Sequence, residues 1–249
     1  MNARTLNEAS AAVSVDPQSL PLQRLYHWER TQPERVAFVQ PLGGGVTQEL
    51  SWREVLDQTR RLAAWLQAQG FPPGSRIAIL SKNTAWWMIC AYAIWMAGHV
   101  SVPLYPTLAA DTVRQILDHS GSRLLFIGKL DGFDAMRLGI RAGLPCVTTP
   151  LSPAAAPGRR WTDVLAGQAP LQDAPVRDAT ELATLMYTSG TTGKPKGVMH
   201  SFGTLMWSLQ SGMKRVHLDA HTRMLSYLPL SHVVERVLVE HGQLATGMQ

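Results

Sequence analysis

The residues most suited to chemistry form a short polar segment in the second half of the chain. Residues 187–197 read YTSGTTGKPKG and combine glycines, hydroxyl side chains and two lysines. Gly190, Gly193 and Gly197 allow sharp turns that bring backbone N–H groups close to an anion. The hydroxyl and ammonium groups supply further hydrogen-bond donors. This composition predicts a loop that binds phosphate, and a nucleotide triphosphate is the expected ligand.

The segment does not fit the P-loop of the nucleotide triphosphatases. That motif needs Gly, four residues and then Gly-Lys-Ser/Thr, whereas Gly193 and Lys194 are followed by Pro195, and Thr188 stands where the first glycine is required. The alternative is a polar connection between a strand and a helix, because Gly/Ser/Thr loops are common in α/β proteins. The full order of hydroxyls, glycines, proline and lysines favours phosphate binding.

Two blocks carry a resemblance to a known family. Residues 187–200, YTSGTTGKPKGVMH, resemble the phosphate-binding signature of the acyl-adenylate-forming enzymes, which include acyl-CoA synthetases, nonribosomal peptide adenylation domains and luciferases. Residues 227–237, YLPLSHVVERV, are similar to the block that follows this loop in long-chain fatty acyl-CoA synthetases. Residues 50–80 and 97–127 resemble the opening of the same large domain. The resemblance covers the chain from about Leu20 onward and points to the amino-terminal part of such an enzyme.

The resemblance implies a two-step activation of a carboxylic acid. The carboxylate attacks the α-phosphate of ATP and pyrophosphate leaves, after which the acyl group passes to coenzyme A and AMP leaves. Because an anion must approach a polyanion, catalysis would depend on positioning and charge neutralisation. Magnesium (Mg²⁺) is expected, since this hard cation prefers oxygen ligands.

The resemblance also assigns roles to single residues of the loop. Thr188 would give the metal an oxygen ligand, and Lys194 is a weaker candidate because flanking lysines can simply be solvated. Lys196 would also be catalytic. The β- and γ-phosphates would be held by hydroxyl, glycine and lysine residues: Ser189, Gly190, Thr191, Thr192, Gly193 and Lys196.

The second block supplies the candidate for the acid side of the site. By resemblance, His232 would lie near the reacting carboxylate and donate a hydrogen bond there, and a structural role for this histidine is the alternative. Glu235 and Arg236 are interpreted as a helix ion pair. Their place in the long-chain pattern favours a fatty acid over an amino or aryl acid as the substrate.

Composition indicates a globular protein. The chain has 249 residues, of which 45% are hydrophobic and 16% are charged, and this argues against disorder. The net charge of +5 comes without a run of basic residues, so no nucleic-acid partner is expected. Cys90 and Cys146 form neither a disulfide framework nor a metal-ligand pattern, which fits a reducing cytoplasm.

The amino terminus and the longest apolar run bear on localisation. The first 16 residues lack the apolar core of a signal peptide, so a cytoplasmic protein is expected. Residues 85–98 are too short to span a bilayer, which takes about 20 residues, and are interpreted as a buried helix. The tryptophans in this run leave a peripheral membrane contact open.

Hydrophobic periodicity predicts an α/β fold with a parallel sheet covered by helices on both faces, because apolar strands alternate with helices. Ser51, Asn83 and Asp111 are expected to cap helices. The expected strands include a hairpin over 36–50 and cover 76–80, 100–104, 123–127, 184–187 and 224–228. The expected helices cover 23–32, 51–70, 85–97, 111–119, 201–215 and 233–244.

The chain divides into three parts by composition. Residues 1–20 form an amino-terminal tail, and residues 21–178 form a first α/β subdomain. Repeated prolines indicate that residues 130–178 are a loose connection within it. Residues 179–249 are the start of a second α/β subdomain, which carries the phosphate loop and is expected to be truncated.

Several motifs of the resembled family do not occur in the sequence. There is no Tyr-Gly-x-Thr-Glu segment to stack the adenine, no Thr-Gly-Asp ribose motif, and no small C-terminal domain with its lysine. We therefore expect little ligase turnover from this chain alone, and completion by a carboxy-terminal half or by a homo-oligomer. The alternatives are a noncatalytic module that binds nucleotide, acyl groups or a partner, and an enzyme that adenylates another carboxylic acid.

Overall fold

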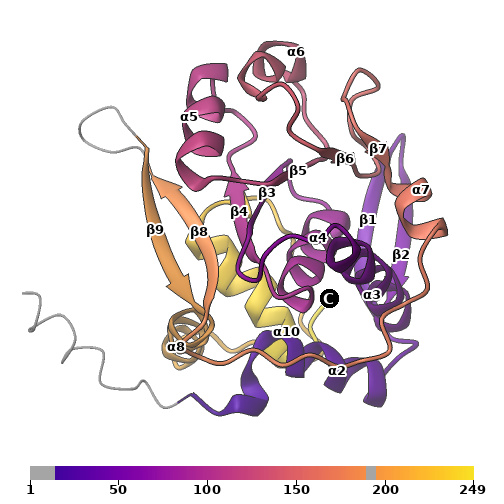
Figure 1. Cartoon of the computed structure of the whole chain (residues 1–249). Helices are drawn as coiled ribbons and strands as arrows, with labels where there is room; N and C mark the ends of the chain where they lie inside the picture. Colours follow the sequence, from indigo (N-terminus) through magenta and orange to yellow (C-terminus); the bar gives the residue numbers. More distant parts are fainter. Residues whose placement is uncertain (1–14, 189–194) are drawn as a thin grey trace, which may run out of the picture.

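The computed structural model describes residues 15–188 and 195–249, and Figure 1 shows the chain around one large sheet. This sheet has seven strands in the order β7-β6-β5-β3-β4-β8-β9, and all neighbouring pairs are parallel except β8 and β9. The strands are β3 (Arg76–Leu80), β4 (Val100–Leu104), β5 (Leu124–Ile127), β6 (Cys146–Thr148), β7 (Arg159–Arg160), β8 (Leu182–Thr188) and β9 (Lys196–Ser201). The predicted α/β class with a parallel sheet is confirmed.

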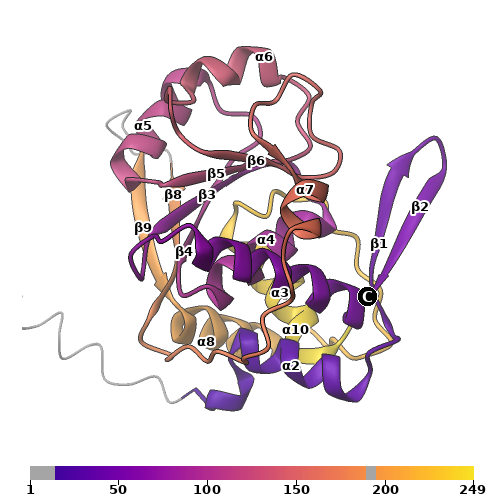
Figure 2. The same cartoon turned by 45° about the vertical axis from the view of Figure 1, so that its right-hand side comes forward.

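Helices cover both faces of this sheet, as Figures 1 and 2 show from two sides. The longer helices are α2 (Pro21–Thr31), α3 (Trp52–Ala68), α4 (Ala85–Met96), α5 (Ala110–Ser120) and α8 (Phe202–Met213). The shorter ones are η1 (Pro17–Ser19), α6 (Phe133–Met136), η2 (Arg137–Gly139), α7 (Trp161–Ala166), α9 (Val233–Glu235), the π-helix η3 (Arg236–His241) and α10 (Gly242–Thr246).

Alternation along the strands divides the core into two parts. In β3, Ile77 and Ile79 point to the face that packs against α2, α3, α4 and α8, whereas Ala78 and Leu80 point to the face that packs against α5 and α6. Helix α4 lies in the larger part and all of its residues are buried, which explains why its sequence is apolar all round.

A two-stranded hairpin outside the large sheet packs against the larger part of the core. It consists of β1 (Val36–Gly43) and β2 (Val46–Ser51), which pair antiparallel. The chain then enters α3 through a capping box, in which Glu54 N–H donates to Ser51 Oγ at 3.3 Å and Ser51 N–H donates to Glu54 Oε2 at 2.7 Å. The hairpin and the Ser51 cap are therefore confirmed.

Two predicted helix caps were wrong. Thr84 caps α4 by accepting a hydrogen bond from Trp87 N–H, and Asn83 instead bonds to the segment before α9. The N-cap of α5 is Ala109, which has no side-chain acceptor, and Asp111 lies within the first turn. Both errors are shifts of one or two residues, which is the scale on which helix ends vary.

The second half of the chain differs from the prediction in two places. Strand β9 lies between the phosphate segment and α8, where a direct entry into a helix was expected. Residues 224–228 form no strand. Within this segment, Met224 N–H donates to the backbone carbonyl of Gln249 at 2.8 Å, and the Leu228 carbonyl accepts from the Asn83 side chain. Strands β6 and β7 lie within residues 130–178 and extend the sheet. The division into subdomains stays a prediction.

In the part of the chain that the structure describes, no helix is both long enough and apolar enough to cross a bilayer.

Candidate functional site

The β8–β9 hairpin places the two ends of the phosphate segment side by side. Thr188 ends β8 and pairs in register with Lys196 at the start of β9, and both residues are exposed. Thr188 therefore presents a hydroxyl, and Lys196 an ammonium group, at the mouth of one hairpin. The remaining predicted phosphate ligands lie outside the described residues, together with the weaker candidate Lys194: Ser189, Gly190, Thr191, Thr192 and Gly193.

The hairpin is packed closely just below its mouth. A side chain at Gly197 would bring a Cβ to 2.9 Å from Leu185 Cδ1 and 3.3 Å from Tyr187 Cζ, so glycine lets β9 lie against these two residues. Tyr187 is buried, and its hydroxyl lies 2.7 Å from Nδ1 of His119 near the end of α5. Burial raises the pKa of the Tyr187 phenol above its usual 10. Thr188 is thus carried by a strand end that is fixed to the adjacent helix.

The hairpin mouth lies at the edge of the sheet where ligands bind in this kind of fold. Strand β8 is parallel to β4, so Thr188 is at the same edge as the carboxyl ends of the other parallel strands. Asn83 and Lys129 follow β3 and β5 at this edge. In open α/β sheets, ligand sites form outside the carboxyl ends of the strands. This edge is therefore the candidate site.

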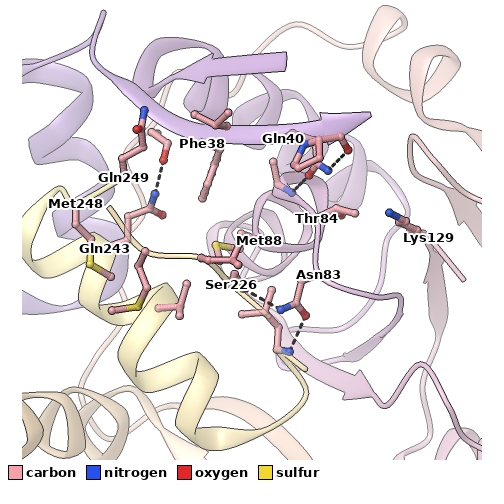
Figure 3. A pocket seen from close by; sticks show the side chains of 18 residues that line it. Phe38, Gln40, Asn83, Thr84, Met88, Lys129, Ser226, Gln243, Met248 and Gln249 are labelled. Carbon is pink, nitrogen blue, oxygen red and sulfur yellow. Dashed lines mark hydrogen bonds between the residues drawn. The ribbon is translucent and has the colours of Figure 1, made fainter. Parts of the chain in front are cut away.

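A cavity of about 230 Å³ opens near this edge, beside β1 and the start of α4 (Figure 3). Its wall is largely apolar, with Phe38, Met88 and Met248 among the lining residues. At one end, Asn83 holds the second block: its Nδ2 donates to the Leu228 carbonyl at 2.6 Å, and its Oδ1 accepts from Leu230 N–H at 2.9 Å. No periodic pattern in the sequence predicts this cavity, because its lining residues come from segments far apart in the chain.

His232 begins α9 as its N-cap. Its side chain is exposed, and Nδ1 accepts a hydrogen bond from Val234 N–H at 3.3 Å. Among the described residues it makes no hydrogen bond to Thr188 or Lys196. The structure therefore gives His232 a local structural role, and its role toward a carboxylate stays a prediction.

The predicted ion pair of Glu235 with Arg236 was wrong. Adjacent helical residues point in different directions, so Glu235 accepts from Ser226 Oγ at 2.7 Å instead. Arg236 Nε donates to Glu240 Oε2 at 2.8 Å, one helical turn later, and both side chains are fully buried. The spacing of four residues was the signal that could have identified this pair.

Arg236 is enclosed by aromatic rings and polar groups. Its guanidinium carbon lies 5.1 Å from the ring centre of Trp87 and 5.4 Å from that of Trp95. Burial, and then the charge of Arg236, lower the pKa of the half-buried His200 on β9 below its usual 6.5. Arg236 also bonds to Thr184, the partner of His200 in the hairpin, so the second block lies close to the strand that follows the phosphate segment.

Comparison with known families identifies the family of the chain that carries the β8–β9 hairpin. The model of the AMP-binding enzyme family matches residues 25–249, which include β8, β9 and the second block. The chain belongs to the AMP-binding enzyme family. The family resemblance inferred from residues 187–200 is thereby confirmed.

Several proteins that are similar to this AMP-binding chain are named as CoA ligases. It is 32% identical over 236 residues to the long-chain-fatty-acid–CoA ligase FadD15 of Mycobacterium bovis, with 90% of this chain and 39% of that protein covered. The chain thus spans about two fifths of the length of this relative. A benzoate CoA ligase from Burkholderia xenovorans has a similar fold, with a TM-score of 0.78, 19% identity, and coverage of 92% of this chain and 44% of that one.

A solved structure of ATP-bound MatB from Rhodopseudomonas palustris also shares the fold. Its TM-score is 0.74 at 21% identity, and the match covers 92% of this chain and 44% of that chain. At such identities the likeness shows the fold alone. The AMP-binding chain therefore has the sheet and helix arrangement of the N-terminal domain of adenylate-forming CoA ligases.

Proposed function

We propose that this chain carries the triphosphate-binding part of an AMP-forming acid–thiol ligase, which activates a long-chain fatty acid through an acyl-adenylate and transfers it to coenzyme A. The observation that carries the proposal is the pairing of Thr188 with Lys196 at the carboxyl edge of the sheet, within a chain of the AMP-binding family. The ATP bound to the fold relative MatB supports ATP as the ligand.

Lys196 and Thr188 have the chemistry that the first step requires. In this step a carboxylate oxygen attacks the α-phosphorus of ATP and forms a new phosphorus–oxygen bond. The bond between the α-phosphorus and the α,β-bridging oxygen breaks, and pyrophosphate leaves with its electron pair. An ammonium group at the hairpin mouth offsets the charge of the outer phosphates, both as ATP binds and as pyrophosphate leaves. Catalysis of this kind needs positioned charge and no protein nucleophile.

At a magnesium site beside the hairpin mouth, Thr188 would supply one oxygen ligand and ATP and water would supply others. No group of three or more His, Cys, Asp or Glu side chains that could hold a metal occurs in residues 15–188 and 195–249. In nucleotide sites Mg²⁺ keeps several waters and takes phosphate oxygens with one or two carboxylates, and the exposed hydroxyl of Thr188 would add one neutral oxygen ligand to such a set. When bound, the ion would neutralise phosphate charge.

Two observations support a fatty acid as the substrate. The relative FadD15 is named as a long-chain-fatty-acid–CoA ligase and is 32% identical to this chain. The cavity beside the second block has an apolar wall, which is the surface chemistry that an alkyl chain requires. Phe38, Met88 and Met248 offer an alkyl chain apolar contact along this wall.

Calorimetric titration of the chain with Mg²⁺-ATP tests the proposal. We expect Lys196→Ala to weaken ATP binding by about 10-fold to 100-fold, because a hydrogen bond to a charged group contributes about 1.5–3 kcal/mol. Lys214→Ala is the matched control, since Lys214 is an exposed lysine just after α8 and away from the hairpin mouth.

Three results would separate the alternatives. Absence of ATP binding by the unaltered chain, or equal weakening by both lysine substitutions, would contradict the proposal. If the chain binds ATP but releases no pyrophosphate from it when palmitate is added, the isolated chain is better described as a noncatalytic nucleotide-binding module. Release of pyrophosphate with another acid but not with palmitate would correct the substrate class.

A further inference from the structure

Arg236 connects the second sequence block to the strand that carries Thr188. Its Nη1 donates to Thr184 Oγ1 on β8 at 3.1 Å and to Ser101 Oγ on β4 at 3.5 Å. Thr184 Oγ1 in turn donates to the Ser101 carbonyl at 2.9 Å. One side chain from the helical segment therefore bonds to two neighbouring strands of the sheet. The two acceptors, Ser101 on β4 and Thr184 on β8, are paired in register.

The contacts of Arg236 are poorly explained by stability alone. Taking both charges out of water costs free energy, and replacing a buried ion pair by apolar residues of similar size is often neutral or stabilising. In the described part of the chain, Arg236 Nη2 and Glu240 Oε1 are buried without a hydrogen-bond partner, which adds to that cost. A guanidinium in this place is better explained by its directed bonds to the sheet.

Arg236 and its partner Thr184 each lie four residues along the chain from a candidate site residue. Its backbone N–H donates to the His232 carbonyl at 3.2 Å, so it lies one helical turn after the residue that begins α9. Its partner Thr184 lies four residues before Thr188 on β8, and Thr184 pairs with His200 on β9. The bond from Arg236 to Thr184 therefore holds the start of α9 at a set position relative to both β8 and β9.

We propose that Arg236 is a positioning residue, which fixes the helical segment against β8 and so sets the separation between His232 and the hairpin mouth at Thr188 and Lys196. The inference rests on the proposed function for its catalytic meaning, since that function needs the acid side and the phosphate side of the site at a set distance. The geometric part does not depend on ATP turnover.

The test measures that separation in variants that lose the bond to the sheet. Thr184→Val removes the nearer acceptor, at 3.1 Å, with little change in shape and leaves only the longer contact to Ser101 Oγ at 3.5 Å. The double variant Arg236→Met with Glu240→Leu removes both bonds to the sheet and the ion pair without leaving a lone charge. Thr59→Val is the matched control. Thr59 is also fully buried, and its hydroxyl bonds within α3 to the Val55 carbonyl.

Spin labels on cysteines introduced at Val198 and Val234 report the separation by pulsed electron resonance. Both positions are exposed, one on β9 and one in the turn after His232. The native Cys90 and Cys146 are buried, and burial raises the pKa of both thiols, so the labels react with the introduced cysteines first. Urea unfolding of each labelled variant shows whether it is folded.

We expect one narrow distance distribution for the unaltered chain and for Thr59→Val, and a shifted or broadened one for the other two variants while they remain folded. An unchanged distribution in folded Thr184→Val would overturn the proposal and leave Arg236 a purely structural residue. If the double variant does not fold, Thr184→Val alone decides. Failure of the unaltered chain to bind ATP would overturn the proposed function but leave this measurement intact.

Discussion

At the scale of single residues, His241 is a buried histidine that the fold keeps neutral. Its ring stacks on Trp95 with centres 5.9 Å apart, and neither ring nitrogen has a hydrogen-bond partner among the described residues. Burial, and to a lesser degree the charge of Arg236, lower the pKa of His241 from 6.5 to about 3. The unfolded chain therefore binds a proton here at pH values where the folded chain does not.

His241 should make the folded chain less stable as the pH falls. Because the folded-state pKa lies below the unfolded-state value, the stabilisation is fully present above pH 6.5 and is lost as the pH falls toward 3. Within this window the group lowers the free energy of unfolding by up to about 1.4 kcal/mol per pH unit. We expect His241→Phe, which keeps the ring on Trp95, to lose less stability than the unaltered chain when urea unfolding is measured from pH 7 to pH 4.5.

The exposed His217 provides the control for this prediction. His217→Phe removes an exposed histidine and tests whether the loss of any histidine changes the pH dependence of stability. The buried Glu240 is present in all three proteins and its contribution cancels in the comparison. Parallel profiles for His241→Phe and the unaltered chain would show that His241 does not control acid stability.

At the scale of elements, the cap of α3 has a measurable contribution to stability. Ser51 and Glu54 exchange hydrogen bonds through their side chains and backbones. Ser51→Ala removes the acceptor for Glu54 N–H, so we expect the free energy of unfolding in urea to fall by about 1 kcal/mol. Ser208→Ala is the control, since Ser208 lies inside α8, where alanine is the better helix former, and should cost nothing. A loss of equal size in both variants would argue against the capping box.

Secondary structure could be predicted best for elements whose apolar residues recur at a single regular spacing. Helix α3 carries a cap and a buried face, and strands β3 and β4 are short apolar runs, so these elements could be predicted from residue spacing. Strand β9 could not, because its residues are exposed or half-buried and follow no alternation. Residues 224–228 have the composition of a strand, but strand formation also requires a partner, which no single segment reveals.

The candidate site was predictable only in part, for a related physical reason. Thr188 and Lys196 lie in one sequence block, so the hairpin that joins them is a local feature. The bond of Arg236 to Thr184 spans 52 positions, and the roles of Asn83 and Glu240 arise from packing that brings distant segments together. Such contacts depend on the whole fold, whereas sequence patterns report mainly the local backbone.

At the scale of the whole molecule, the outer edge of β9 is exposed. Strand β9 is the last strand in the order of the sheet, and in the described part of the chain it pairs only with β8. It also carries exposed apolar side chains, with Met199 72% and Val198 41% accessible. An edge strand with free backbone groups and apolar side chains is a template for pairing with another chain. We therefore expect the isolated chain to self-associate through β9.

Sedimentation velocity over a range of chain concentrations tests this expectation. Met199→Lys places a charge on the edge, which disfavours strand pairing, and should raise the dissociation constant by about tenfold, equivalent to about 1.4 kcal/mol. Leu138→Lys adds the same charge at a similarly exposed leucine, 68% accessible in η2, which packs against α5, and should leave association unchanged. If both variants weakened association equally, the cause would be net charge and not the β9 edge. A chain that stayed monomeric at all concentrations would show that the edge is protected by its own twist or side chains.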